Sequence, residues 1–118
     1  IDPADQILVL GEGIETMLSV REAAPSLPVW AALSSGHLGA VLLPDGLQRL
    51  YIAIDRDPAG QRAAERLTAR ATEAGIAVRV LKPRLGDFND DLRAHGAEAL
   101  RQHLAEQIDL KDQHRLTI

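Results

Sequence analysis

The chain has 118 residues, a hydrophobic share of 46% and a formal charge of -4, which fits one ordinary globular domain with a single core. The absence of cysteine excludes disulfides, thiolate chemistry and cysteine-ligated zinc, and agrees with a cytoplasmic origin. No apolar run approaches the roughly 20 residues of a membrane span, so no membrane partner is expected. The mild acidity is also unlike the basic excess of a free-standing nucleic-acid binder.

Short apolar runs alternate with stretches of helical spacing along the chain. Apolar runs bounded by glycine or polar residues predict buried parallel strands, and apolar residues that recur about every four positions predict amphipathic helices. In chain order, the expected elements are a strand over 7–10, a helix over 14–24, a strand over 29–33, a glycine-rich turn over 34–39 that can lead into a short helix ending at Pro44, a strand over 49–54, a helix from Pro58 to about Gly75, a strand over 76–81, a loop over 82–86, and one or two further helices.

This alternation predicts a doubly wound α/β domain. Strands joined through helices form a mainly parallel sheet, here of four strands, with helices on both faces because the crossovers are right-handed. Asp57 and Pro58 occupy the N-cap and first position of the long third helix, which are good start signals. Because the chain opens on Ile1 rather than Met and both ends are polar, we expect residues 1–118 to be a single domain excised from a larger protein.

Acidic residues follow three of the predicted strands. They are Glu12 after the first strand, Asp55 and Asp57 after the third, and Asp87, Asn89 and Asp90 after the fourth. Since the carboxyl ends of parallel strands meet at one edge of a sheet, we expect these oxygen ligands to gather there. Two carboxylates one residue apart are costly to hold together without a cation, and an all-oxygen site suits Mg²⁺ or Mn²⁺. The sequence therefore predicts a divalent metal site.

Each acid also has a simpler explanation. Asp57 can serve only as an N-cap, Glu12 as a solvated loop acid, and Asp87 and Asp90 as acids favoured at a helix start. Asp91 is expected to be solvated. The metal site is favoured because the candidate acids share one edge of the predicted sheet with little lysine nearby.

Four residues are weaker candidates for contact with phosphate or nucleic acid. They are Gly13, Arg56, Gly60 and Lys82. Glycine early in a helix costs up to about 1 kcal/mol relative to alanine, so close approach of a loop or a phosphate would explain Gly60. Arg56 can point at a phosphate or to solvent, and Lys82 can neutralise a phosphate or lie on the surface. Tyr51 is expected to pack in the core, which leaves no obvious nucleophilic tyrosine.

Three segments together resemble the signature of the Toprim domain. They are Gly11-Glu12-Gly13-Ile14-Glu15-Thr16, Asp55-Arg56-Asp57-Pro58-Ala59-Gly60 and Gly86-Asp87-Phe88-Asn89-Asp90. This module is shared by bacterial-type DNA primases, type IA and type II topoisomerases, OLD-family nucleases and RecR recombination-repair proteins. The resemblance covers about residues 5–107. The first and last segments are most similar to the Toprim domains of plasmid- and phage-type primases and primase-helicases.

The resemblance implies roles for the acids. Glu12 would act as an acid/base group or a metal ligand, and Asp55 and Asp57 would be paired magnesium ligands. Asp87, with Asn89 or Asp90, would match a further acidic cluster that binds additional metal. Cellular primases often have an aspartate where this chain has Thr16, and Asn89 replaces one acid, so the number of metals stays open.

The resemblance also implies an activity and its partners. Mg²⁺- or Mn²⁺-dependent nucleotidyl or phosphoryl transfer is expected, above all primer synthesis by a DNA primase of a mobile element. DNA and nucleoside triphosphates would be the substrates, and flanking zinc-binding or helicase domains the partners. The alternatives are an OLD-type nuclease, a topoisomerase-like domain, and a non-catalytic Toprim module in recombination or repair.

Overall fold

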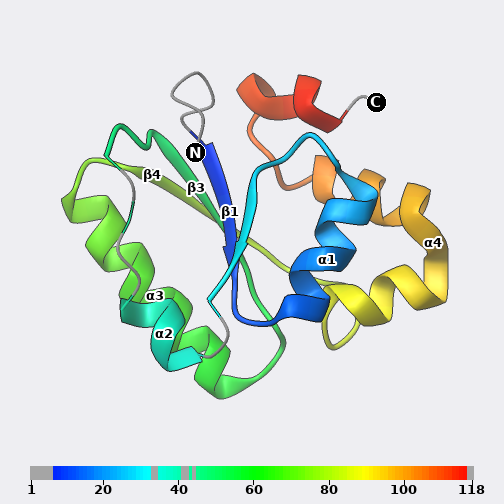
Figure 1. Cartoon of the computed structure of the whole chain (residues 1–118), viewed down its shortest axis with the longest axis horizontal. Coiled ribbons are helices and arrows are strands. Elements are labelled where there is room, and N and C mark those ends of the chain that lie inside the picture. The colour runs from blue at the N-terminus through cyan, green and yellow to red at the C-terminus, as the bar shows by residue number, and fades with distance from the viewer. Residues whose placement is uncertain (1–6, 33–34, 41–42, 44, 117–118) are drawn as a thin grey trace.

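The computed structural model describes residues 7–32, 35–40, 43 and 45–116. Its sheet has four parallel strands in the order β2-β1-β3-β4. The strands are β1 (Ile7–Gly11), β2 (Val29–Ala31), β3 (Arg49–Ala53) and β4 (Ala77–Leu81). Helices α1 (Ile14–Ala23) and α4 (Phe88–Ala105) cover one face, and α2 (Ser35–Ala40) and α3 (Pro58–Glu73) cover the other (Figure 1). The predicted doubly wound α/β fold is confirmed, with every described strand pair parallel.

Two apolar clusters lie on opposite faces of the sheet. Successive side chains of a strand point to opposite faces, so Ile7 and Val9 pack in the cluster under α1 and α4, whereas Leu8 and Leu10 pack in the cluster under α3. All of β1 is buried. A strand covered on both faces reads as a continuous apolar run rather than an alternating one, which is why the sequence identified it.

The helices differ from the expectation in two places. Ser35–Ala40 is helical within the expected glycine-rich turn. The one or two helices expected after the fourth strand are present as α4, whose two parts meet at Gly96, where φ is 87°. The chain continues into a 3₁₀ helix, η1 (Leu110–Leu116), which the sequence analysis missed. The predicted strand end at Leu33, the start of the turn at Ser34 and the helix end at Pro44 lie outside the described residues. Among the helices of the described part, none combines the length and apolarity needed to cross a bilayer.

A buried polar network attaches η1 to the sheet at the end where the strands begin. Arg49 donates from Nε and Nη2 to the two carboxylate oxygens of Asp112, each at 2.7 Å, and the Tyr51 hydroxyl donates to the same carboxylate. Asp112 is fully buried. Burial alone would raise the pKa of Asp112, but the hydrogen bonds from Arg49 and Tyr51 outweigh it and lower that pKa. Tyr51 is in the core as expected, and it also anchors the C-terminal segment.

Candidate metal centre

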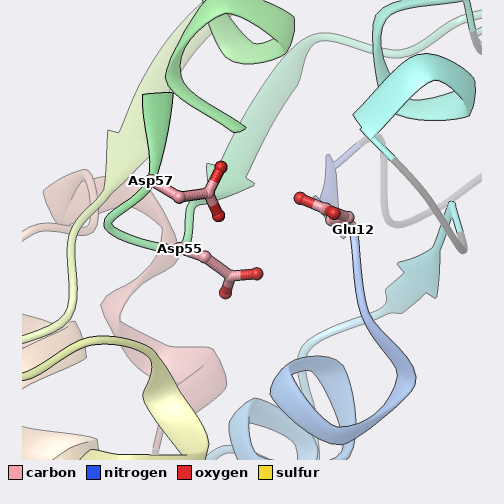
Figure 2. Close-up of side chains that lie close together, drawn as sticks. All are labelled: Glu12, Asp55 and Asp57. Atoms are coloured by element: carbon pink, nitrogen blue, oxygen red, sulfur yellow. The ribbon is translucent and has the colours of Figure 1, made fainter. Parts of the chain in front are cut away.

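Three carboxylates meet where β1 and β3 end. Gly11 and Ala53 are register partners in these adjacent parallel strands, so the loops that follow leave the sheet side by side. Glu12, Asp55 and Asp57 each place a carboxylate oxygen within 4.8 Å of the other two, and all three residues are half-buried. Figure 2 shows the two aspartates pointing toward Glu12 across a common space. The predicted meeting of these acids at the carboxyl edge is therefore present, and we refer to them as the acidic triad.

Gly11 permits this close approach of the two loops. A Cβ added at Gly11 would lie 3.0 Å from the carbonyl oxygen of Ala53 and would clash with the sulfur of Met17. The strand end can therefore pack against both β3 and α1 only without a side chain at this position. At Gly13 a Cβ would meet open space, so no close contact within the protein requires glycine there. Its contact with a phosphate stays a prediction.

Asp57 is the N-cap of α3. Its Oδ1 accepts the backbone N–H of Gly60 at 2.6 Å, and Pro58 occupies the first turn, as the sequence predicted. Because the cap uses one oxygen and a carboxylate has two, capping and metal binding are compatible. A Cβ at Gly60 would lie only 3.2 Å from that capping oxygen. The expected close approach at Gly60 is thus made by the Asp57 carboxylate itself.

Substitution of Gly60 by alanine is expected to weaken metal binding without unfolding the domain. The added methyl group would push the Asp57 carboxylate by a few tenths of an ångström. Alanine improves helix propensity by about 1 kcal/mol, which offsets the strained cap, so the free energy of unfolding should change by less than about 1 kcal/mol. Calorimetric titration with Mn²⁺ and thermal unfolding check the two expectations. Wild-type Mn²⁺ affinity in Gly60→Ala would contradict the role given to Asp57.

Asp55 is held by a residue of α1. The buried Thr16 donates from its hydroxyl to Asp55 Oδ1 at 3.1 Å. Burial raises the pKa of Asp55 above its usual value, and the neighbouring carboxylates of Asp87, Asp57 and Asp90 raise it further, although the Thr16 hydrogen bond opposes the shift. Thr16 therefore stabilises the charged form of Asp55, the form that binds a cation.

Removal of that hydroxyl is expected to lower metal affinity. In Thr16→Val the side chain keeps its shape but loses the donor, so the pKa of Asp55 should rise further and protons should compete more strongly with the metal. Loss of a hydrogen bond that orients a ligand typically weakens metal binding about 10-fold or more. The loss should be larger at acidic than at alkaline pH, because protons compete with the metal for Asp55 more strongly as the pH falls towards its raised pKa. Thr16→Ser, which keeps the hydroxyl, should titrate with Mn²⁺ like the wild type; equal losses in both variants would contradict the hydrogen-bond role.

The acidic cluster of Asp87, Asn89 and Asp90 lies near the triad. Asp87 and Asn89 make hydrogen bonds that belong to the packing of α4. Asp87 is the N-cap of α4, with its Oδ1 accepting the N–H of Asp90 at 2.7 Å. Asn89 accepts a hydrogen bond from Ser19 of α1 at 3.3 Å, and Asp90 is exposed. Among the described residues, only the triad forms a carboxylate group close enough to share one ion. Ligation of a further ion by Asp87, Asn89 or Asp90 stays a prediction.

Asp91 is buried, so the expectation that it is solvated was wrong. It is 2% exposed, and its two carboxylate oxygens accept the backbone N–H groups of Arg84 and Leu85, both at 2.7 Å. It therefore fixes the loop that links β4 to α4. Two adjacent aspartates at a helix start look alike in the sequence, so the pattern could not predict that Asp90 is exposed and Asp91 buried.

The two cationic candidates follow the carboxyl ends of strands β3 and β4. Arg56 lies between the two aspartates, and its guanidinium donates from Nε and Nη2 to the carbonyl oxygen of Pro83, at 3.1 and 2.6 Å. Lys82 is exposed at the end of β4. Within the described part of the chain, no basic side chain forms an ion pair with Asp55 or Asp57.

The acidic triad fits a divalent cation. Three carboxylates from two loops supply an all-oxygen donor set, which is the environment that Mg²⁺ and Mn²⁺ prefer. The pKa of Asp55 is raised first by its burial and then by the neighbouring carboxylates of Asp87, Asp57 and Asp90. A bound cation would offset both the burial and the repulsion. The identity of the ion belongs to the proposal below.

Comparisons with known proteins agree with this fold. The family model of the Toprim domain matches residues 7–98, whereas no curated protein matches the chain. The Aquifex aeolicus primase, in a structure of its zinc-binding and RNA polymerase domains, is similar at 22% identity and a TM-score of 0.57, over 92% of this chain and 27% of that chain. A second similar chain comes from a structure of bacteriophage T7 lagging-strand DNA polymerase interacting with primase domains of two gp4 subunits bound to an RNA/DNA hybrid and dTTP. It is 25% identical, with a TM-score of 0.57, over 83% of this chain and 53% of that chain.

These matches support the resemblance inferred from the three sequence segments. The family model spans most of the chain and includes all three segments, and the similar solved structures are of primases. The chain spans about a quarter and about half of the length of those two solved chains. The chain therefore belongs to the Toprim-domain family.

Proposed function

We propose that this chain is the catalytic Toprim domain of a DNA primase of a mobile element, and that it carries out Mg²⁺- or Mn²⁺-dependent nucleotidyl transfer. The acidic triad is the observation that carries the proposal, because it gathers three carboxylates at the sheet edge where α/β folds bind ligands. The similarity to primases of a bacterium and of a phage favours primer synthesis over other Toprim activities.

Each residue of the site has a defined task in this proposal. Asp55 and Asp57 bind the metal, and Glu12 either completes the ligand set or accepts a proton from the attacking 3'-hydroxyl. The Thr16 hydroxyl donates to Asp55 and favours its charged form, and the N–H of Gly60 fixes the orientation of Asp57. A divalent cation, when bound, supplies stabilisation of the negative charge that develops on the transferred phosphoryl group.

The chain is proposed to act within a longer polypeptide. Residues 1–118 would form one Toprim domain, with flanking zinc-binding or helicase domains that grip the template. Support comes from the limited share of the two solved chains that this chain covers. The proposed substrates are DNA and nucleoside triphosphates. The protein's net charge of -4 agrees with a template grip supplied elsewhere.

Primer synthesis by the polypeptide encoded by the complete gene tests the proposal. Single-stranded DNA, nucleoside triphosphates and Mg²⁺ or Mn²⁺ should yield short labelled primers, and chelation of the metal should abolish them. Cleavage of DNA without added nucleotides would contradict primer synthesis and indicate an OLD-type nuclease or a topoisomerase-like activity. Failure to bind Mg²⁺ or Mn²⁺ at all would contradict both and indicate a non-catalytic module.

A further inference from the structure

An open pocket lies between α3 and the edge strand β4. It has a volume of about 690 Å³, within the range of pockets that bind ligands of nucleotide size. Its apolar lining comes from Ile54, Ala64 and Val80, and its cationic side chains are Arg56 and Lys82. The chain links this pocket to the acidic triad, because Arg56, which lines the pocket, stands between Asp55 and Asp57 in the sequence.

The guanidinium of Arg56 and the backbone of Lys82 are held by hydrogen bonds that leave both positive charges available. Arg56 engages the Pro83 carbonyl oxygen through Nε and Nη2 only, and a guanidinium has five N–H donors. The backbone of Lys82 is clamped by Gln107, whose Oε1 accepts the Lys82 N–H at 2.7 Å and whose Nε2 donates to the Lys82 carbonyl oxygen at 3.0 Å. Within the described residues, the Lys82 ammonium has no acidic partner.

The remaining lining is suited to polar groups of a ligand. Gln61 and Thr68 of α3 supply an amide and a hydroxyl, and Glu65 supplies an acceptor. The backbone N–H of Gln61 bonds to the carbonyl oxygen of Asp57 at 3.0 Å, so this wall starts one helical turn from the triad. The pocket therefore combines the anchored guanidinium of Arg56, the ammonium of Lys82, an apolar floor and hydrogen-bonding groups.

We propose that this pocket binds one nucleotide unit next to the metal centre. The phosphate would lie at Arg56 and Lys82, and the sugar and base would lie against Ile54, Ala64 and Val80. An anionic phosphate matches the cations, and the flat apolar face of a base matches the floor. The inference rests on the proposed function, since it names where that site holds its substrate. The unit belongs either to a single strand or to a free nucleoside triphosphate.

Binding of a fluorescent oligothymidylate to the 118-residue chain, measured by anisotropy with and without Mg²⁺, tests the pocket. Lys82→Gln removes one cation that forms no ion pair within the described residues, and should weaken binding roughly 10-fold. Its matched control is Lys111→Gln, which removes the same charge from η1 at the opposite end of the sheet and should change binding by less than about twofold. The dependence of affinity on salt should also become shallower in Lys82→Gln alone.

A second variant fills the pocket without altering charge. Ala69 lines the pocket from an exposed position of α3, so Ala69→Leu should fold normally and weaken binding of the oligothymidylate. Thr72→Leu, an exposed position on the same helix that lines no described pocket, is its control. Wild-type affinity in both Lys82→Gln and Ala69→Leu would overturn the proposal. Equal weakening by the control Lys111→Gln would also overturn it, because the attraction would then be non-specific.

Competition with ATP distinguishes the two sources of the nucleotide. Displacement of the oligothymidylate by ATP, lost in Ala69→Leu, assigns the pocket to a free nucleoside triphosphate. Binding of the oligothymidylate that ATP does not displace assigns it to a nucleotide within the strand. Mn²⁺ affinity should be unchanged in Lys82→Gln and Ala69→Leu. The proposal for the pocket can therefore be contradicted without contradicting the metal centre. Absence of Mn²⁺ binding by the wild type would contradict the proposed function separately.

Discussion

Asp55→Asn and Asp57→Asn are expected to abolish nucleotidyl transfer by the complete protein, with a loss of at least about 100-fold in rate. Each change removes a negative charge from the acidic triad while keeping the size of the side chain. Asparagine also remains a good N-cap at position 57, and Thr16 can still donate to an amide oxygen at position 55. The fold should therefore survive in both variants, and primer synthesis with Mg²⁺ measures the loss. Undiminished synthesis would contradict the assignment.

The stability of Asp55→Asn provides a control, because this variant should lose activity but should not lose stability. The pKa of Asp55 is raised in the folded protein, so its ionised form destabilises the fold above its unfolded pKa of about 3.9. Replacement by neutral asparagine should make the metal-free protein as stable as the wild type or more stable at neutral pH. Added Mn²⁺ should raise the unfolding temperature of the wild type but not of the variant. A large loss of stability in the metal-free variant would indicate a structural role instead.

Asp112→Ala is expected to cause the largest loss of stability. Removal of the carboxylate leaves the Arg49 guanidinium and the buried Tyr51 hydroxyl without their shared acceptor. Breaking a buried charged pair typically costs about 3–5 kcal/mol. Because the network lies at the opposite end of the sheet from the triad, Mn²⁺ affinity of the folded fraction should not change. Chemical denaturation measures the free energy of unfolding.

Two comparisons test the cause of that loss. Glu98→Gln breaks the exposed ion pair between Glu98 and Arg101 and should cost less than about 0.5 kcal/mol. The pKa of Asp112 is lowered in the folded protein, so its contribution is complete above the unfolded pKa of about 3.9 and is lost as the pH falls through the folded value. The difference between wild type and Asp112→Ala should shrink below about pH 4. A difference independent of pH would contradict the electrostatic account.

The sheet and the triad could be predicted because their signals are local. Strands buried on both faces appear as uninterrupted apolar runs, and Asp57-Pro58 is a start signal readable from adjacent residues. A parallel sheet then places Glu12 near Asp55 whatever the details of the loops, since all strands end at one edge. The sequence thus predicted the meeting of Glu12, Asp55 and Asp57, whereas ligation by Asp87, Asn89 and Asp90, which it also predicted, stays a prediction.

The remaining features depend on contacts between distant segments. Asp112 lies in a polar stretch, and its burial follows only from pairing with Arg49 across 63 positions of the chain. A buried tyrosine usually needs a partner for its hydroxyl, so Tyr51 signalled that a polar group was near without identifying it. Nothing in the sequence likewise distinguishes Asp91 from its neighbour Asp90. The burial of Asp91 follows from the β4–α4 loop, whose backbone N–H groups donate to its carboxylate. The preference for glycine at position 60 follows only from the Asp57 carboxylate, which leaves little room for a Cβ there.

A crystal soaked in Mn²⁺ and measured at the manganese absorption edge tests the central claim most directly. We expect an anomalous peak bounded by carboxylate oxygens of Glu12, Asp55 and Asp57, with ligand distances of about 2.0–2.3 Å, and its disappearance in Asp55→Asn. Manganese bound elsewhere with none at the acidic triad, or an unchanged peak in the variant, would contradict the account.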